Sequence, residues 1–144
     1  MKQKYGLYEL GPKDFTYKGH RIIRTDFHVI NERKNKIECS LYTPNIKLQH
    51  YPCIVYLHGN CGSRKDSLSI VKQFVPHKMA VLSFDFAGCG MSTGDYISLG
   101  WFERKDTELI LVKLKALFPQ ITDIVLWGRS MGAVTALLYS GNNP

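Results

Sequence analysis

Three short apolar runs constrain the fold more than any other feature of the sequence. "CIVYLHG", "MAVLSFDF" and "DIVLWG" are continuous enough to form strands that are buried on both faces, as in parallel sheets. A segment with helical periodicity follows each run, which predicts an α/β fold with a mostly parallel sheet and helical crossovers. The runs are residues 53–59, 79–86 and 123–128, and the helical segments are residues 63–76, 102–119 and 131–141.

Two earlier segments alternate apolar with polar residues, which is the period of a half-exposed strand. They are residues 24–32 and 36–44, and the polar stretch "RKNK" between them predicts a hairpin. No linker rich in Pro, Gly or Ser divides the 144 residues, a length that suits one domain. We therefore expect an N-terminal extension over residues 1–25 and one α/β domain over residues 26–144.

Composition and charge narrow the classes of function. The net charge is +7, but the basic residues are scattered among acids, as on a solvated surface, and no nucleic-acid-binding module is visible. No run approaches the roughly 18 apolar residues of a membrane span, and the first residues lack the apolar core of a secretory signal. The sequence therefore indicates a cytoplasmic protein with no nucleic-acid partner and no membrane span.

The four cysteines form no CxxC pair and have no metal-ligand spacing. Cys39 and Cys53 fall in predicted strands, where a thiol behaves as a small buried apolar group. Cys61 and Cys89 fall in glycine-rich loops. Reduced thiols are expected in a cytosolic protein, and a redox or metal role for Cys61 with Cys89 is the alternative.

The third apolar run leads into "GRSMG", directly before a predicted helix. Strand, Gly-x-Ser-x-Gly and helix together predict a nucleophile elbow, a sharp turn that exposes the hydroxyl group of Ser130. Gly128 and Gly132 lack the Cβ that would clash where the strand crosses the helix. The N-terminus of the helix favours the negative charge that develops there during acyl transfer.

A second candidate element, "YLHGNCGSR", follows the first apolar run. Acyl transfer needs N–H donors that point at the developing oxyanion. One is expected to be the backbone N–H of Met131, directly after the candidate nucleophile. The other is expected from the loop His58-Gly59-Asn60, in the position where this kind of fold supplies its second donor.

These stretches, together with "VLSFDFAGCGMSTGD" and "SLGW", resemble the N-terminal part of the α/β-hydrolase superfamily, in the serine aminopeptidase-like branch of uncharacterised hydrolases. The resemblance implies that Ser130 is the nucleophile and that Asn60 and Met131 offer the oxyanion-hole amides. It implies that "DFAGCGMSTG" supports the oxyanion loop. The expected reaction is hydrolysis of an ester, thioester or amide of a small molecule, lipid or peptide, with no metal or cofactor.

In this fold, the catalytic acid and then the histidine follow the serine along the chain. The 14 residues after Ser130 contain no Asp, Glu or His. The resemblance implies that these partners belong to further strands and helices, so the sequence is expected to be a fragment whose acid and histidine lie beyond residue 144. Little hydrolysis is expected from residues 1–144 alone, although an oxyanion hole can leave a residual rate.

His58, Asp85 and Ser130 follow the His-Asp-Ser order of an unrelated β-barrel protease fold, but the alternation of strands and helices argues against that fold. His58 is expected instead to shape the oxyanion turn, and Asp85 and Asp95 to cap or brace the glycine loop. The other histidines are expected to lie at the surface or in packing contacts; they are His20, His28, His50 and His77.

Several features of the sequence allow interpretations other than hydrolysis. "GCGMSTG" has neither the glycine spacing nor the following helix of a dinucleotide-binding loop. For Arg129, a surface salt bridge is the simpler interpretation, and a substrate carboxylate or phosphate is the alternative. A hydrolase-like binding protein or an inactive fragment is the alternative to an enzyme. The run "DIVLWG" is expected to expose an apolar strand edge through which the chain self-associates.

Overall fold

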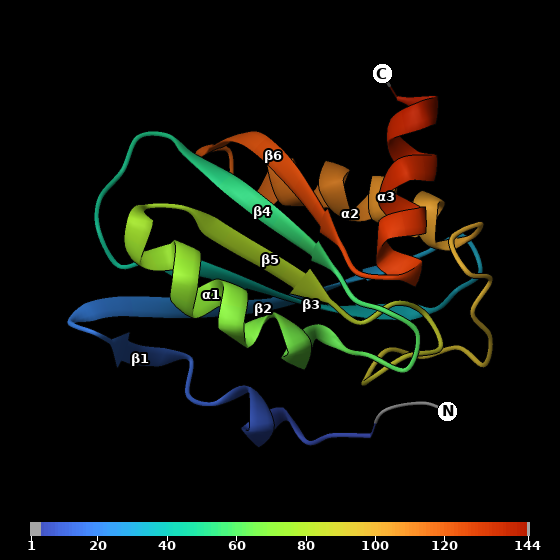
Figure 1. The fold of residues 1–144 in the computed structure, drawn as a ribbon, viewed down its shortest axis with the longest axis horizontal. Helices are drawn as coiled ribbons and strands as arrows, with labels where there is room; N and C mark the ends of the chain where they lie inside the picture. Colours follow the sequence, from blue (N-terminus) through green and yellow to red (C-terminus); the bar gives the residue numbers. More distant parts are fainter. Residues whose placement is uncertain (1–3, 144) are drawn as a thin grey trace.

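One sheet of six strands forms the centre of the computed structural model, which describes residues 4–143 (Figure 1). Across the sheet, the strand order is β1-β2-β3-β5-β4-β6. The strands are β1 (Asp14–Tyr17), β2 (His20–Ile30), β3 (Lys36–Pro44), β4 (Tyr51–Leu57), β5 (Ala80–Phe84) and β6 (Ile121–Gly128). The α-helices are α1 (Leu68–Phe74), α2 (Glu103–Leu117) and α3 (Met131–Asn142), and the 3-10 helices are η1 (Leu7–Leu10), η2 (Arg64–Ser67) and η3 (Val75–His77).

Helices cover both faces of the sheet, and the predicted α/β class is confirmed (Figure 1). On one face, Ile70 of α1 joins Ile54 of β4 in a buried cluster. On the other face, Ile110 of α2 and Met131 of α3 join Val55 of β4 in a second cluster. β4 and β5 are buried on both faces, as their apolar runs predict. The same prediction is wrong for β6 within the described residues, because the residues of this strand after Ile121 are exposed or half-buried. No helix within residues 4–143 combines the length and apolar composition needed to cross a bilayer.

The sheet is mixed, which corrects the expectation of a mostly parallel sheet. Within the described residues, β4 pairs in parallel with β5 and β6, whereas the pairs β1/β2, β2/β3 and β3/β5 are antiparallel. Short turns join β1 to β2 and β2 to β3, and such turns connect antiparallel neighbours. The helical crossovers come later in the chain, so parallel pairing is confined to β5, β4 and β6.

The predicted hairpin of β2 and β3 is confirmed, with nine residue pairs in antiparallel register. It is longer than the sequence indicates, because β2 begins at His20 and pairs with β1 across a two-residue turn. In this turn, Lys18 and Gly19 have φ angles of 48° and 80°, the geometry that suits a tight hairpin. The expected boundary between residues 25 and 26 falls inside β2, so the strand pairs on both sides of it.

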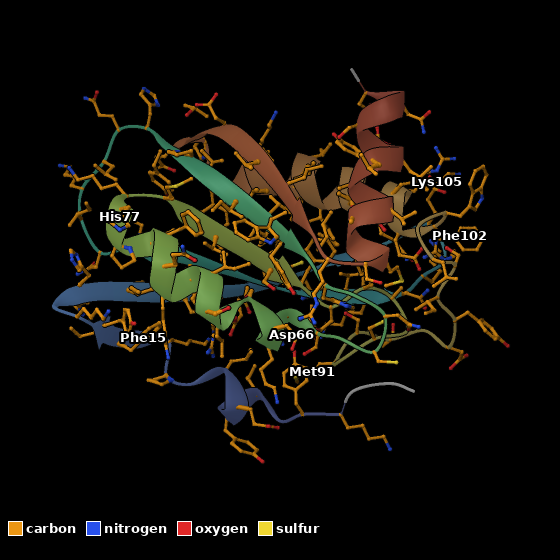
Figure 2. The ribbon with its side chains drawn as sticks, viewed as in Figure 1. Phe15, Asp66, His77, Met91, Phe102 and Lys105 are labelled. Carbon is orange, nitrogen blue, oxygen red and sulfur yellow. The ribbon has the colours of Figure 1, made fainter. Side chains whose placement is uncertain are left out.

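The parallel arrangement of β4, β5 and β6 brings their carboxyl ends to one edge of the sheet. Figure 2 shows Phe102 on this side of the molecule and His77 at the opposite end. In open α/β sheets, ligands bind outside the carboxyl ends of the strands. The segments that leave this edge are residues 58–63, 85–102 and 129–130.

Candidate active site

The turn between β6 and α3 strains the backbone at one residue. Ser130 has φ 53° and ψ −115°, a conformation that is rare for a residue with a side chain. Arg129 N donates to Leu57 O at 3.1 Å, and Gly132 N donates to Arg129 O at 2.9 Å, so bonds on both sides fix the turn. Ser130 is exposed and is the N-cap residue of α3, which is labelled in Figure 1.

The two glycines of this turn stand where a side chain has no room. A Cβ at Gly128 would overlap the backbone of Gly132 and Ala133. A Cβ at Gly132 would overlap the carbonyl group of Leu57, at the end of β4. The backbone of the elbow therefore packs directly on neighbouring backbone. The sequence predicts glycines at these two positions for this steric reason.

His58 uses both of its ring nitrogens inside the protein. Nε2 accepts a hydrogen bond from Phe86 N at 3.0 Å, so the ring proton is assigned to Nδ1, which donates to Gly59 O at 2.7 Å. The side chain is fully buried, and burial lowers the pKa of His58, which favours the neutral ring. His58 thus shapes the turn after β4 and has no free nitrogen for Ser130, so the alternative triad with Asp85 is excluded.

The loop after β4 lies against the candidate nucleophile. A Cβ placed on Gly59 would lie 3.3 Å from the carbonyl oxygen of Arg129 and 3.5 Å from the Cβ of Ser130, so the loop backbone packs directly against the elbow. Gly62 N donates to Gly59 O at 2.9 Å and closes the turn that carries Asn60. Neither the Asn60 nor the Met131 backbone N–H donates to a backbone acceptor within residues 4–143 outside its own element.

Asp85 braces the glycine loop after β5, as the sequence predicts. Its fully buried carboxylate accepts hydrogen bonds from the backbone N–H groups of Arg64 at 2.7 Å and Met91 at 2.9 Å. A third hydrogen bond comes from the hydroxyl group of Tyr5 at 2.6 Å. Asp95, the other acid of this loop, is exposed.

Glu103 is a buried carboxylate to which the sequence analysis assigns no role. It accepts hydrogen bonds from Ser98 N and Gly100 N, both at 2.9 Å, and from Ser98 Oγ at 2.6 Å. These bonds fasten the "SLGW" turn to the first turn of α2. A Cβ on Gly100 would lie 2.9 Å from Cγ1 of Val134, so the same turn packs on α3. The signal in the sequence is the spacing of Gly100 and Glu103. A glutamate three residues after a turn residue accepts the N–H of that residue in a capping box.

No general base is bonded to Ser130 within the part of the chain that the structure describes. The histidines other than His58 are exposed, in agreement with the prediction of surface positions, and none of the hydrogen bonds of residues 4–143 joins a histidine or carboxylate to Ser130. The exposed histidines are His20, His28, His50 and His77. The described residues therefore contain a candidate nucleophile and candidate oxyanion amides without a base.

Arg129 is exposed and forms no ion pair among residues 4–143, so the predicted surface salt bridge has no partner in this part of the chain. Cys39 and Cys53 are buried, as predicted, and burial raises the pKa of Cys53 to about 12. Cys61 is exposed and Cys89 is buried, and no disulfide joins the described cysteines. Residues 4–143 gather no group of three His, Cys, Asp or Glu side chains suited to a metal ion.

Sequence comparison relates the chain to known hydrolases. The family model of the serine aminopeptidase family, S33, matches residues 49–144. An abhydrolase domain-containing protein of Schizosaccharomyces pombe is 29% identical over 135 residues, which are 88% of this chain and 37% of that protein. The uncharacterized protein YqkD of Bacillus subtilis is 35% identical over 88 residues, which are 61% of this chain and 29% of that protein.

Solved structures show the same fold. The esterase Pf2001 of Pyrococcus furiosus is 25% identical with a TM-score of 0.70, over 80% of this chain and 43% of that one. The α/β-hydrolase GrgF of Penicillium is 21% identical with a TM-score of 0.69, over 81% of this chain and 41% of that one. The chain thus spans less than half the length of these relatives. Because the family model matches most of the sequence, the chain belongs to the S33 serine aminopeptidase family of α/β-hydrolases.

Proposed function

We propose that the protein is a serine hydrolase in which Ser130 attacks the carbonyl carbon of an acyl substrate. The observation that carries the proposal is an exposed serine held at φ 53° between β6 and the N-terminus of α3. This position leaves Oγ open to a substrate, and the helix N-terminus favours the negative charge that develops during attack. Membership of the serine aminopeptidase family supports the same chemistry.

The backbone N–H groups of Asn60 and Met131 are the proposed oxyanion hole. Met131 follows Ser130 directly, and Asn60 follows Gly59, whose backbone lies against Ser130. His58 holds this loop through its hydrogen bond to Gly59 O. Fixed donors of this kind cost no reorganisation as charge develops, and losing one costs about 100- to 1000-fold in kcat.

The general base is proposed to be a histidine beyond residue 144, oriented by an Asp or Glu that precedes it in the chain, in the order that this fold uses. The histidine takes the proton of Ser130 as Oγ bonds to the carbonyl carbon. It then returns the proton to the leaving group, and an acyl-enzyme remains. Water, activated by the same histidine, cleaves the acyl-enzyme and restores the serine. Residues 1–144 alone are therefore expected to hydrolyse substrates slowly.

The proposed substrate is an ester, thioester or amide of a small molecule, lipid or peptide. Support comes from the family, which is described as serine aminopeptidases, and from the Pyrococcus furiosus protein, which is an esterase. These two activities differ in the leaving group and share attack at an acyl carbon. The proposed reaction uses side chains, backbone amides and water, so it needs no metal or cofactor.

Labelling with a fluorophosphonate tests the role of Ser130. An activated serine forms a P–O bond to the probe and releases fluoride. The longest form of the protein made by its natural source is used, and its intact mass shows whether residues follow residue 144. Ser130→Ala is expected to lower the labelling rate by at least about 1000-fold, whereas Ser140→Ala, an exposed site on the same helix, is expected to react like the wild type.

Two results would contradict the proposal. One is a label that persists in Ser130→Ala at the wild-type rate. The other is a wild-type protein that the probe does not label, which would favour a hydrolase-like binding protein instead.

A further inference from the structure

The N-terminal segment, residues 4–12, is fastened to the body of the protein at three points. Figure 1 shows it running from β1 along one side of the molecule toward the loops at the carboxyl edge of the sheet. The attachments join Tyr5 to Arg64 and Asp85, Glu9 to Lys65, and the carbonyl groups of Leu10 and Gly11 to Arg24. A segment without a strand partner is thereby held in one place.

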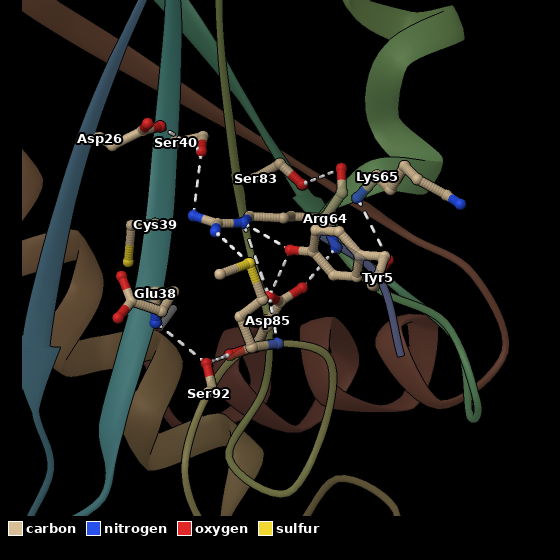
Figure 3. Close-up of polar contacts among 12 residues, drawn as sticks. Tyr5, Asp26, Glu38, Cys39, Ser40, Arg64, Lys65, Ser83, Asp85 and Ser92 are labelled. Atoms are coloured by element: carbon tan, nitrogen blue, oxygen red, sulfur yellow. Dashed lines mark hydrogen bonds and ion pairs between the residues drawn. The ribbon is translucent and has the colours of Figure 1, made fainter. Parts of the chain in front are cut away.

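Tyr5 makes the attachment that reaches the fully buried side chains of Arg64 and Asp85. Its hydroxyl group donates to Asp85 Oδ2 at 2.6 Å and accepts from Arg64 Nε at 2.7 Å, with the ring beside both side chains (Figure 3). Burial, and then the charge of Asp85, raises the pKa of Tyr5, so the hydroxyl keeps the proton that it donates. The hydroxyl is thus a bridge between a carboxylate and a guanidinium.

Arg64 and Asp85 form a buried ion pair that the Tyr5 hydroxyl bridges. Their side chains are 1% and 0% exposed, and Arg64 Nε lies 3.5 Å from Asp85 Oδ2. Arg64 Nη1 also donates to Ser40 Oγ at 3.1 Å, and the Ser40 hydroxyl donates to Asp26 (Figure 3). Buried charges are stable only when hydrogen bonds satisfy them. Without the Tyr5 hydroxyl, each member of the pair has one hydrogen bond fewer.

Asp85 and Phe86, which are adjacent in the chain, contact the two ends of the loop after β4. Arg64 is the first residue of η2 and directly follows the loop of residues 58–63. Its backbone N–H donates to Asp85 Oδ1 at 2.7 Å. Asp85 directly precedes Phe86, whose N–H bonds to His58 at the start of the loop. A contact that holds Asp85 in place therefore acts on both ends of this loop.

We propose that residues 4–12 form a strap and that Tyr5 is a positioning residue for the oxyanion hole. Through Arg64 and Asp85, the Tyr5 hydroxyl keeps the backbone N–H of Asn60 in place. The catalytic part of this proposal rests on the proposed function, which assigns that N–H to the oxyanion. The strap itself is a property of the fold, and the family match begins after it.

Hydrogen–deuterium exchange of Tyr5→Phe tests the strap without any activity. The variant keeps the ring and removes one hydroxyl group. The control is Tyr8→Phe, because Tyr8 is 83% exposed in the same segment. Loss of the hydrogen bonds that a neutral hydroxyl makes to two charged side chains is expected to speed exchange of the amides in residues 59–66 and 85–91 about tenfold. Tyr8→Phe is expected to exchange like the wild type.

Labelling by the fluorophosphonate tests the positioning role in the longest natural form of the protein. Tyr5→Phe is expected to lower the labelling rate constant about tenfold, a fraction of the effect of losing an oxyanion donor. The final labelled fraction is expected to equal that of the wild type and of Tyr8→Phe. A purely structural role would lower the labelled fraction and leave the rate constant of the folded molecules unchanged.

Each outcome decides one part of the proposal. Unchanged exchange of residues 59–66 in Tyr5→Phe overturns the strap, whatever the reactivity of Ser130. Faster exchange with an unchanged labelling rate constant overturns the positioning role. A wild-type protein that does not react contradicts the proposed function and the positioning role together, and the exchange experiment then decides the strap by itself.

Discussion

His58 shows how a residue type associated with catalysis is committed to structure. Burial lowers the pKa of His58 in the folded protein and favours the neutral ring, whose Nε2 accepts the N–H of Phe86. In the unfolded chain, the imidazole protonates at its ordinary pKa of about 6.5. The unfolded state therefore gains a proton first as the pH falls. The resulting stability is present above the unfolded pKa and is lost as the pH falls below it.

We expect acidification below about pH 6.5 to lower the free energy of unfolding through His58, by at most about 1.4 kcal/mol per pH unit. His58→Gln removes this titration, so the variant should be less stable but should show a shallower slope between about pH 6.5 and 5. His77→Gln, at an exposed histidine, is the matched control. Urea denaturation at several pH values measures the slopes, and equal slopes in both variants would contradict the assignment.

The crossing of β4, the elbow and α3 is set by backbone contact between elements. Gly132→Ala places a Cβ on the carbonyl group of Leu57, so strand and helix must separate. We expect a loss of about 3 kcal/mol or more in the free energy of unfolding. Gly141→Ala, on the same helix with no atom within 4 Å of the new Cβ, should gain about 0.5 kcal/mol. Thermal denaturation compares them, and a similar Tm for the two variants would contradict this account.

Elements with a local burial pattern are those that the sequence predicts. The apolar runs predict β4, β5 and β6, and periodicity predicts α1, α2 and α3, because burial on fixed faces repeats along the chain. β1 is missed, since its four residues alternate between exposed and half-buried and none is fully buried. The insertion of β5 between β3 and β4 is a long-range pairing, and no local spacing encodes it.

The candidate site also has a part that the sequence predicts and a part that only the folded molecule brings together. Ser130 lies between Gly128 and Gly132 in one short motif, so the motif predicts all three residues. Tyr5 and Asp85 are 80 positions apart, and their hydrogen bond exists only after the N-terminal segment has reached the carboxyl edge of the sheet. Proximity of this kind is a product of the fold, which is why the sequence indicates the nucleophile but not the network beside it.

The outer strand β6 leaves an apolar edge open within residues 4–143. It pairs with β4 on one side, and Val125 and Trp127 on its exposed face are 49% and 41% exposed. Unpaired N–H and C=O groups beside apolar side chains favour pairing with another chain. We expect the 144-residue chain to self-associate through β6 at about 100 µM, and sedimentation velocity at increasing concentration measures the species.

A matched pair of lysine substitutions separates edge pairing from net charge in this experiment. Val125→Lys puts a charge on β6, as natural sheet edges do, and is expected to shift the sedimenting species toward monomer. Val112→Lys adds the same charge on α2, where Val112 is 65% exposed, and is expected to leave association unchanged. Equal dissociation by both variants would make general repulsion the cause, because only one of them alters the edge. A wild-type chain that stays monomeric at every concentration would show that β6 does not recruit a second chain.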